Sequence, residues 1–295
     1  MQDSQNDAVV TQLARAADAL ERLASASGAS PSGLEPPDWS ARAFRWRAPD
    51  RLEAITRPHQ VDPDQLLGID TQKDTLFRNT QQFLAGAPAN DALLWGARGT
   101  GKSSLVKSLL VRFADSHLRL IEIDAQDLIE LPRLTPLLAQ RPERFIIFVD
   151  DLSFEAQDAS YKALKAMLDG SLAVPPDNVI LYATSNRRHL MPEFHADNAS
   201  ARIVNEELHH GEAVEEKISL SDRFGLWLSF HPYSQAQYLD IVAEYLNRLI
   251  PNGPGGNDWR DDALAWALLR GSRSGRTAWQ FARDYAGRNQ LPGQD

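Results

Sequence analysis

Residues 93–104 read Leu-Leu-Trp-Gly-Ala-Arg-Gly-Thr-Gly-Lys-Ser-Ser, and this stretch decides the fold. It fits the pattern G-x-x-x-x-G-K-S, which is typical of a phosphate-binding loop between a buried strand and a helix. The apolar run 92–95 leads into it, and apolar residues follow at helical spacing over 102–114. The sequence therefore predicts a strand, a glycine-rich turn and a helix, in that order.

The loop supplies the groups that hold a chain of phosphates. Its glycines let the backbone N–H groups point inward, and the N-terminus of the following helix adds a positive dipole. Lys102 is expected to reach the β- and γ-phosphates, and the hydroxyl of Ser103 to bind Mg²⁺. The expected phosphate-binding residues are Gly96, Ala97, Arg98, Gly99, Thr100, Gly101, Lys102, Ser103 and Ser104.

The composition is that of an ordinary globular protein, with 43% hydrophobic and 24% charged residues among 295. The sequence has no cysteine, so neither a disulfide framework nor a thiolate metal site is expected. It shows no apolar stretch long enough for a membrane span and no secretory signal, and we expect a cytoplasmic protein. The net charge of −9 argues against a large nucleic-acid interface.

The chain divides into four predicted parts. Residues 1–36 hold an amphipathic helix over 7–26, which packs on the body or docks a partner, and a linker rich in Ser, Gly and Pro. Residues 37–60 form an arginine- and tryptophan-rich connecting segment. Residues 61–231 alternate strands and helices as a nucleotide-binding domain, and residues 232–295 read as a small helical domain.

The connecting segment interleaves aromatic and basic residues. Trp39, Phe44 and Trp46 alternate with five arginines between positions 42 and 57. Such a strip can stack bases and neutralise phosphates, but more often the rings pack on the body while the arginines stay solvated. We favour packing over contact with nucleic acid.

The third part predicts an α/β fold. Near-continuous apolar runs at 118–123, 144–149, 179–183 and 226–231 alternate with helical segments. Strands without polar alternation are typical of a parallel sheet covered by helices on both faces. Residues 192–219 carry scattered histidines, a pattern that favours a solvated loop over a metal site.

Two aspartates follow one of these strands. Asp150 is expected to hold Mg²⁺ through its water shell, and either Asp151 or Glu155 to polarise an attacking water. Polar residues also follow the next strand, where Asn186 is expected to orient that water or to contact the γ-phosphate. Because parallel strands end at one edge of a sheet, these side chains are expected to face the same crevice.

Together these motifs resemble an AAA+ ATPase, over about residues 60–288. The resemblance rests on Leu66-Leu67-Gly68-Ile69-Asp70, the phosphate-binding loop, Asp150-Asp151, Thr184-Ser185-Asn186-Arg187, Ser221-Asp222-Arg223-Phe224-Gly225 and Gly275-Arg276. More narrowly, segments 96–107, 150–155, 183–190 and 216–227 are similar to those of a bacterial AAA+ family of unknown function.

The resemblance implies a five-stranded parallel sheet with helices on both faces, followed by a helical lid. The phosphate-binding loop would follow a central strand, and strand 179–183 would lie between it and the strand before Asp150. Asn186 would be sensor 1 and Arg276 sensor 2, on a lid helix held by the apolar side chains around it. 

Two further roles follow from the resemblance. Leu67, Gly68 and Ile69 would line the adenine pocket. Arg223 would be an arginine finger, placed too far from its own phosphate-binding loop to serve it and therefore acting on a neighbouring subunit of a homo-oligomer.

The implied activity is slow hydrolysis of ATP with Mg²⁺, coupled to rearrangement of the oligomer or of an unidentified protein partner. Many AAA+ proteins have Glu where this chain has Asp151, so the shorter side chain slows hydrolysis or leaves the base to Glu155. Replication initiators and helicase loaders share the Asp-Asp pair, and a DNA-associated loader is therefore the first alternative. A small-molecule kinase and a non-hydrolysing nucleotide switch are weaker alternatives.

Overall fold

The structure is a computed structural model that describes residues 37–153, 159–169, 176–186, 220–251, 253–254 and 258–290. The predicted helix over 7–26, Glu155 and segment 192–219 lie outside these residues.

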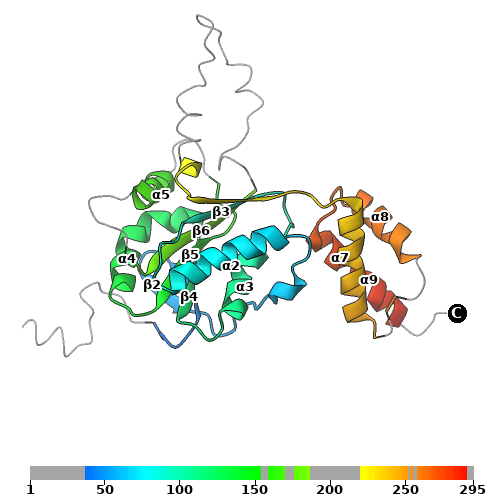
Figure 1. Cartoon of the computed structure of the whole chain (residues 1–295), viewed down its shortest axis with the longest axis horizontal. Helices are drawn as coiled ribbons and strands as arrows, with labels where there is room; N and C mark the ends of the chain where they lie inside the picture. The colour runs from blue at the N-terminus through cyan, green and yellow to red at the C-terminus, as the bar shows by residue number, and fades with distance from the viewer. Residues whose placement is uncertain are drawn as a thin grey trace, which may run out of the picture.

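A seven-stranded sheet forms the centre of the molecule (Figure 1). In spatial order its strands are β2 (Arg51–Ala54), β1 (Ala43–Arg47), β4 (Leu118–Ile123), β5 (Arg144–Val149), β6 (Val179–Ser185), β3 (Ala92–Gly96) and β7 (Leu226–Phe230). Neighbouring strands are parallel except in the β1–β2 hairpin. The parallel α/β sheet is thus confirmed, with β6 between β5 and β3 as the resemblance implied.

The sheet differs from the expectation in two details. The strand before the phosphate-binding loop, β3, is not central but lies one place from the β7 edge. The sheet also gains two strands from segment 37–60, because β1 pairs in parallel with β4 and then turns back as β2. In β1 the rings of Phe44 and Trp46 alternate with arginines, and this period of two is a strand signal.

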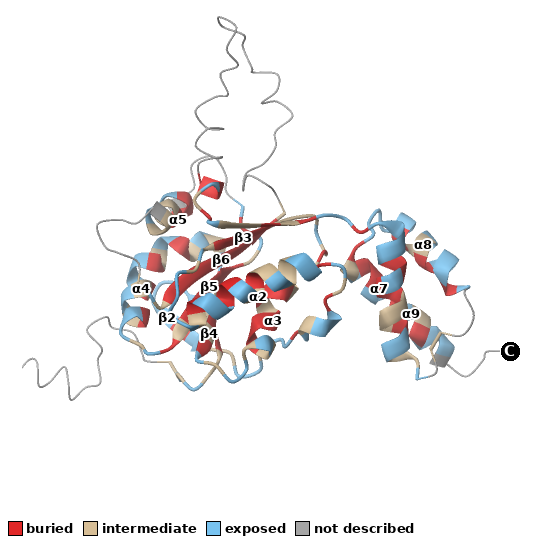
Figure 2. Ribbon diagram, in the orientation of Figure 1, coloured by how far each residue is buried: buried red, intermediate tan, exposed pale blue. Residues whose placement is uncertain are grey.

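Helices cover both faces of the sheet, as predicted. On one face lie α2 (Asp70–Leu84) and α3 (Lys102–Arg112), and on the other lie α4 (Leu131–Ala139), α5 (Ala159–Asp169) and the short η2 (Ala125–Glu130) (Figure 1). The side chains of β5 alternate between two apolar cores, with Phe148 in one core and Phe145 in the other. Both rings are fully buried, so the strands in Figure 2 are buried on both sides.

The aromatic residues of segment 37–60 belong to the interior. Phe44 and Trp46 are fully buried, and the ring of Trp39 packs against that of Phe44 with centroids 5.6 Å apart. The Arg42 guanidinium donates to the carbonyl of Leu110, 2.6 Å away, near the end of α3. The packing interpretation is confirmed for Phe44 and Trp46, because buried rings cannot stack on bases.

Three helices beyond β7 form the lid (Figure 1). They are α7 (Gln235–Leu249), α8 (Trp259–Leu269) and α9 (Gly275–Gln290). A capping box between Ser234 and Gln237 starts α7, and Val242 and Phe281 are buried between the lid helices. Within the described ranges, no helix is both long enough and apolar enough to cross a membrane.

Candidate functional site

The carboxyl ends of the strands and the lid enclose a pocket of about 670 Å³. The predicted residues that line it are Leu67, Ile69, Arg98, Gly99, Gly101, Lys102, Ser103, Ser104, Asp150, Asp151, Asn186 and Arg276. Five predicted and described residues do not line it: Gly68, Gly96, Ala97, Thr100 and Arg223. The tertiary structure therefore brings the phosphate-binding loop, the ends of β5 and β6 and the lid together around one cavity.

The phosphate-binding loop is clamped at its beginning by β7. Gly96 has φ 134°, and a Cβ atom there would lie 1.9 Å from the carbonyl oxygen of Phe230. The next N–H, of Ala97, donates to that same oxygen over 3.0 Å. Only glycine permits this approach of two backbones, which fixes where the loop leaves the sheet.

Lys102 opens α3 and lies inside the loop, with 6% of its surface exposed. Its ammonium group donates to the carbonyls of Gly96 (2.9 Å) and Ala97 (2.7 Å) and to Oδ1 of Asn186 (3.1 Å). Burial lowers the pKa of Lys102 to about 8, although the carboxylates of Asp151 and Asp150 oppose the shift. The lysine is therefore a buried cation held by neutral oxygen atoms, and an anion in the pocket would stabilise its charge.

The helix after the loop and the end of β5 meet at one hydrogen bond. Ser103 donates from Oγ to Oδ1 of Asp150 over 2.5 Å, and the hydroxyl of Thr184 donates to the same carboxylate oxygen over 2.6 Å. A hydroxyl and a carboxylate are the hard oxygen ligands that Mg²⁺ prefers, and Mg²⁺ takes few of them because it keeps several waters. In the part of the chain that the structure describes, no three His, Asp or Glu side chains cluster to hold a metal. The hydroxyl of Ser103 and the carboxylate of Asp150 therefore fit Mg²⁺.

Asp151 is held in a conformation that few residues other than glycine adopt. Its φ is 54°, in the left-handed region. Its N–H donates to the hydroxyl of Thr184 over 2.9 Å, and its carboxylate accepts a hydrogen bond from Nδ2 of Asn186. The Asn186 amide thus bridges Lys102 and Asp151, with Oδ1 facing the first and Nδ2 the second.

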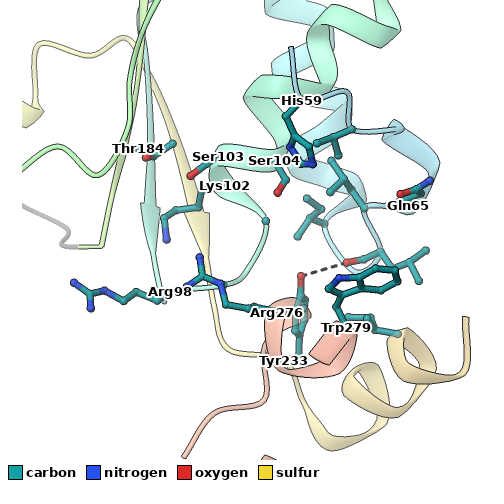
Figure 3. Close-up of a pocket in the computed structure, with 18 of the residues that line it drawn as sticks. His59, Gln65, Arg98, Lys102, Ser103, Ser104, Thr184, Tyr233, Arg276 and Trp279 are labelled. Carbon is teal, nitrogen blue, oxygen red and sulfur yellow. Dashed lines mark hydrogen bonds between the residues drawn. The ribbon is translucent and has the colours of Figure 1, made fainter. Parts of the chain in front are cut away.

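Two arginines were expected to act on phosphate, and in the structure only one of them lines the pocket. Arg276 is the second residue of α9 and lines the pocket, where it extends toward Lys102 in Figure 3. Arg223 lies before β7 and outside the pocket lining. The structure therefore gives Arg276, but not Arg223, a place in the wall of this pocket.

Sequence reasoning missed part of the pocket wall. The residues that it did not assign are His59, Gln60, Val61, Gln65, Leu66, Thr184, Tyr233, Ile241, Tyr245, Gly275 and Trp279. Thr184 and Tyr233 could have been found, because each lies near the carboxyl end of a parallel strand, where such sheets bind ligands. Trp279 could have been found from its position three residues after Arg276, on the same face of α9.

Tyr233 connects the pocket wall to the phosphate-binding loop through its hydroxyl group. Its hydroxyl lies 3.1 Å from the carbonyl oxygen of Thr100 and 3.4 Å from that of Leu67. Burial raises the pKa of Tyr233 to about 12, so the hydroxyl keeps its proton and donates. Gly68 lies against this ring, since a Cβ atom there would come within 3.1 Å of the ring carbon Cε1. Gly68 therefore shapes the wall without lining the pocket.

The order of the parallel strands, the loop after β3 and the helical lid define an AAA+ fold. The chain belongs to the family described as "Protein of unknown function (DUF815)", which matches residues 39–289.

Solved structures with a similar fold include the Orc1 protein of Aeropyrum pernix in complex with DNA. It is 19% identical with a TM-score of 0.53, and the match covers 78% of this chain but only 63% of the Orc1 chain. The RuvB Holliday junction branch migration motor of Thermotoga maritima is 13% identical with a TM-score of 0.43, over 76% of this chain and 71% of RuvB. No curated protein matches the chain. At 19% identity the similarity to Orc1 establishes the fold alone.

Proposed function

We propose that the chain binds Mg-ATP in this pocket and hydrolyses it, and that hydrolysis drives rearrangement of a homo-oligomer or of a protein partner. The observation that carries the proposal is the hydrogen bond between Ser103 and Asp150 beside the buried cation of Lys102. These three groups come from two separate stretches of sequence and supply what a nucleoside triphosphate with Mg²⁺ needs.

In this proposal each group of pocket residues has its own role in phosphoryl transfer. The loop N–H groups, Lys102 and Arg276 bind and orient the phosphates. Mg²⁺, held by Ser103 and Asp150, would neutralise charge on the β- and γ-phosphates. Asp151 takes a proton from a water whose oxygen bonds to the γ-phosphorus, while the bond from that phosphorus to the β-phosphate bridging oxygen breaks. ADP and inorganic phosphate are the products.

Asn186 and the lid complete the proposed mechanism. The Asn186 amide lies between Lys102 and Asp151, where it holds the carboxylate that receives the proton. Glu155 is kept as the alternative base. The lid excludes bulk water, which strengthens every charge interaction inside the pocket.

Arg223 supports an oligomeric enzyme in this proposal. It does not line the pocket of its own chain, and the proposal assigns its guanidinium to the γ-phosphate of a neighbouring chain. This arrangement would make each active site depend on two copies and would couple hydrolysis to the contact between them.

A DNA-associated loader is the second candidate. The support is that the similar Orc1 structure is a complex with DNA. The burial of Phe44 and Trp46 removes these two rings from the features that suggested contact with nucleic acid. Stimulation of ATP hydrolysis by single- or double-stranded DNA would favour the loader, whereas its absence at several salt concentrations favours a protein partner.

Isothermal titration of the full chain with ATP tests the proposal. Lys102→Ala should weaken ATP binding by at least about 100-fold, because it removes the cation at the phosphates. Lys73→Ala is the matched control, since Lys73 pairs with Asp70 on α2 and does not line the pocket. Equal ATP affinity in Lys102→Ala and the wild-type chain would overturn the assignment. Asp150→Ala should keep nucleotide binding and lose its dependence on Mg²⁺.

A further inference from the structure

The end of the pocket away from Lys102 has an aromatic wall that the binding of phosphate does not use. Trp279 of α9 and Tyr245 of α7 both line the pocket there. Trp279 leaves 39% of its surface exposed, whereas Phe281, two residues on, is 1% exposed in the lid core. The apolar residues of this helix were expected to hold Arg276 by packing, and Trp279 in addition lines the cavity.

The position of Trp279 in α9 connects it to the phosphate end. Arg276 and Trp279 are three residues apart, so they lie on one face of the helix, and both line the pocket. In Figure 3 Arg276 extends toward Lys102, while the Trp279 ring lies on the far side of Tyr233. One helix face thus presents a cation to one end of the pocket and an indole to the other.

The Trp279 ring packs against a second aromatic residue of the lid. The Tyr245 ring meets it edge to face, with centroids 5.1 Å apart and planes at 69°. This geometry is the favourable one for two aromatic rings. Since Tyr245 belongs to α7 and Trp279 to α9, the packing of two lid helices sets the plane of the indole.

The pocket also has an aliphatic part. Leu66, Leu67 and Ile69 line the pocket from the segment between η1 (Pro63–Gln65) and α2. Gln65 also lines the pocket and contributes a side-chain amide, on the same side of Tyr233 as Trp279 in Figure 3. One pocket that combines aromatic and aliphatic side chains with the cations of Lys102 and Arg276 fits a planar ring that carries an anionic tail.

We propose that Trp279 is the stacking platform for the base of the bound nucleoside triphosphate, and that Tyr245 positions it. The inference deepens the proposed function, because it assumes a nucleotide in this pocket. Base stacking on an aromatic side chain contributes about 1–3 kcal/mol. Trp279 belongs to α9, whose first residue Gly275 donates to the Gly99 carbonyl over 2.9 Å, so the helix that would contact the base also contacts the phosphate-binding loop.

Two probes separate base binding from phosphate binding: ATP and inorganic tripolyphosphate, which carries the phosphate chain without base or sugar. In titrations of the full chain, Trp279→Ala should weaken ATP binding about 5- to 150-fold, which is the stacking energy converted at about 1.4 kcal/mol per tenfold. Trp279→Phe keeps an aromatic face and should stay within about threefold of wild type. Both variants should bind tripolyphosphate like the wild-type chain.

Leu269→Ala is the matched control in the same lid. Leu269 is 86% exposed on α8 and does not line the pocket, so its removal should change the affinity of neither probe. Unchanged ATP affinity in Trp279→Ala overturns the platform. An equal loss of ATP and tripolyphosphate affinity also overturns it, because the tryptophan would then only support the lid. Failure of the proposed function looks different, because Lys102→Ala would then bind tripolyphosphate as tightly as the wild-type chain.

Discussion

The backbone N–H of Gly275 donates a hydrogen bond of 2.9 Å to the carbonyl of Gly99, so the lid helix α9 begins on the phosphate-binding loop itself. The contact leaves no room for a side chain. A Cβ atom on Gly99 would lie 2.8 Å from the hydroxyl of Ser274, the residue before α9. A substitution at Gly99 is therefore expected to displace the start of α9.

Gly99→Ala should disrupt both stability and binding. The φ of +75° costs an alanine about 1–2 kcal/mol, and the added methyl group displaces Ser274. We expect an ATP affinity at least about tenfold weaker, because the lid no longer closes. Gly271→Ala is the control, since its φ is +62° but nothing lies within 4 Å of the added atom. Urea unfolding and ATP titration of both variants measure these two effects. Equal ATP affinities in Gly99→Ala and Gly271→Ala would contradict the prediction.

Thr184→Val should remove the hydroxyl that holds Asp150 and Asp151 in place. The Thr184 hydroxyl donates to Asp150 and accepts from the N–H of Asp151, and valine has the same shape without the hydroxyl. We expect a loss of about 1–3 kcal/mol in the free energy of unfolding and a weaker dependence of hydrolysis on Mg²⁺.

Thr80→Val is the matched control for Thr184→Val. The Thr80 hydroxyl is also buried, and it bonds to the carbonyl of Leu76 and to the hydroxyl of Tyr182, outside the pocket lining. It should lose comparable stability and keep its Mg²⁺ titration unchanged. A normal Mg²⁺ titration in Thr184→Val would show that its hydroxyl is only structural.

Asp151→Asn should separate binding from hydrolysis. Asparagine tolerates the left-handed φ of 54° and keeps the shape of the side chain, but it does not accept the proton of water. Single-turnover hydrolysis should fall at least about 100-fold, which is the lower range for a general base, while ATP affinity is retained. Glu155→Gln is the comparison. Full activity in Asp151→Asn together with a loss in Glu155→Gln would transfer the role of base to Glu155.

Turnover should depend on contact between chains. An arginine finger contributes about 10³–10⁵ in rate, or about 4–7 kcal/mol of barrier, so Arg223→Ala should bind ATP but hydrolyse it very slowly. Activity per chain should rise with protein concentration. Mixing Arg223→Ala with Lys102→Ala should restore part of the activity, since one chain lends the arginine and the other the intact pocket. If turnover per chain does not depend on protein concentration and the mixture recovers no activity, Arg223 acts only within its own chain.

ATP affinity should fall as the pH rises through about 8. Burial lowers the pKa of Lys102 to about 8 in the free protein, and the phosphates bind its protonated form. Above that pH, binding must first take up a proton, which weakens affinity by up to about tenfold per pH unit. Titrations from about pH 7.5 to 9.5 measure this slope, and Lys73→Ala should share it. A flat profile would show that Lys102 stays charged without nucleotide.

The lowered pKa of Lys102 also affects the free energy of unfolding of the nucleotide-free protein, but with the opposite dependence on pH. The pKa of Lys102 is about 8 when folded, below its ordinary value of 10.5, so the unfolded chain binds more protons between these pH values. The contribution of Lys102 to the free energy of unfolding therefore rises with pH across this window.

The sequence by itself determined the elements whose signal is local. The bounds of β4 and β5 match their apolar runs, because a strand buried on both faces shows its whole length as hydrophobic residues. The phosphate-binding loop is one contiguous segment, so its glycines and Lys102 were assigned from spacing alone. The meeting of Asp150, Asp151 and Asn186 was also predictable, because parallel strands end at one edge.

Only the tertiary structure decided which side each remaining residue faces. Trp279 and Phe281 look alike in the sequence, yet Phe281 is buried while Trp279 lines the pocket, since the packing of α7 on α9 sets the rotation of the helix. The position of Thr184 between two aspartates depends on the parallel pairing of β5 with β6. These contacts join residues far apart in the chain, and local propensity contains no information about which distant surfaces will meet.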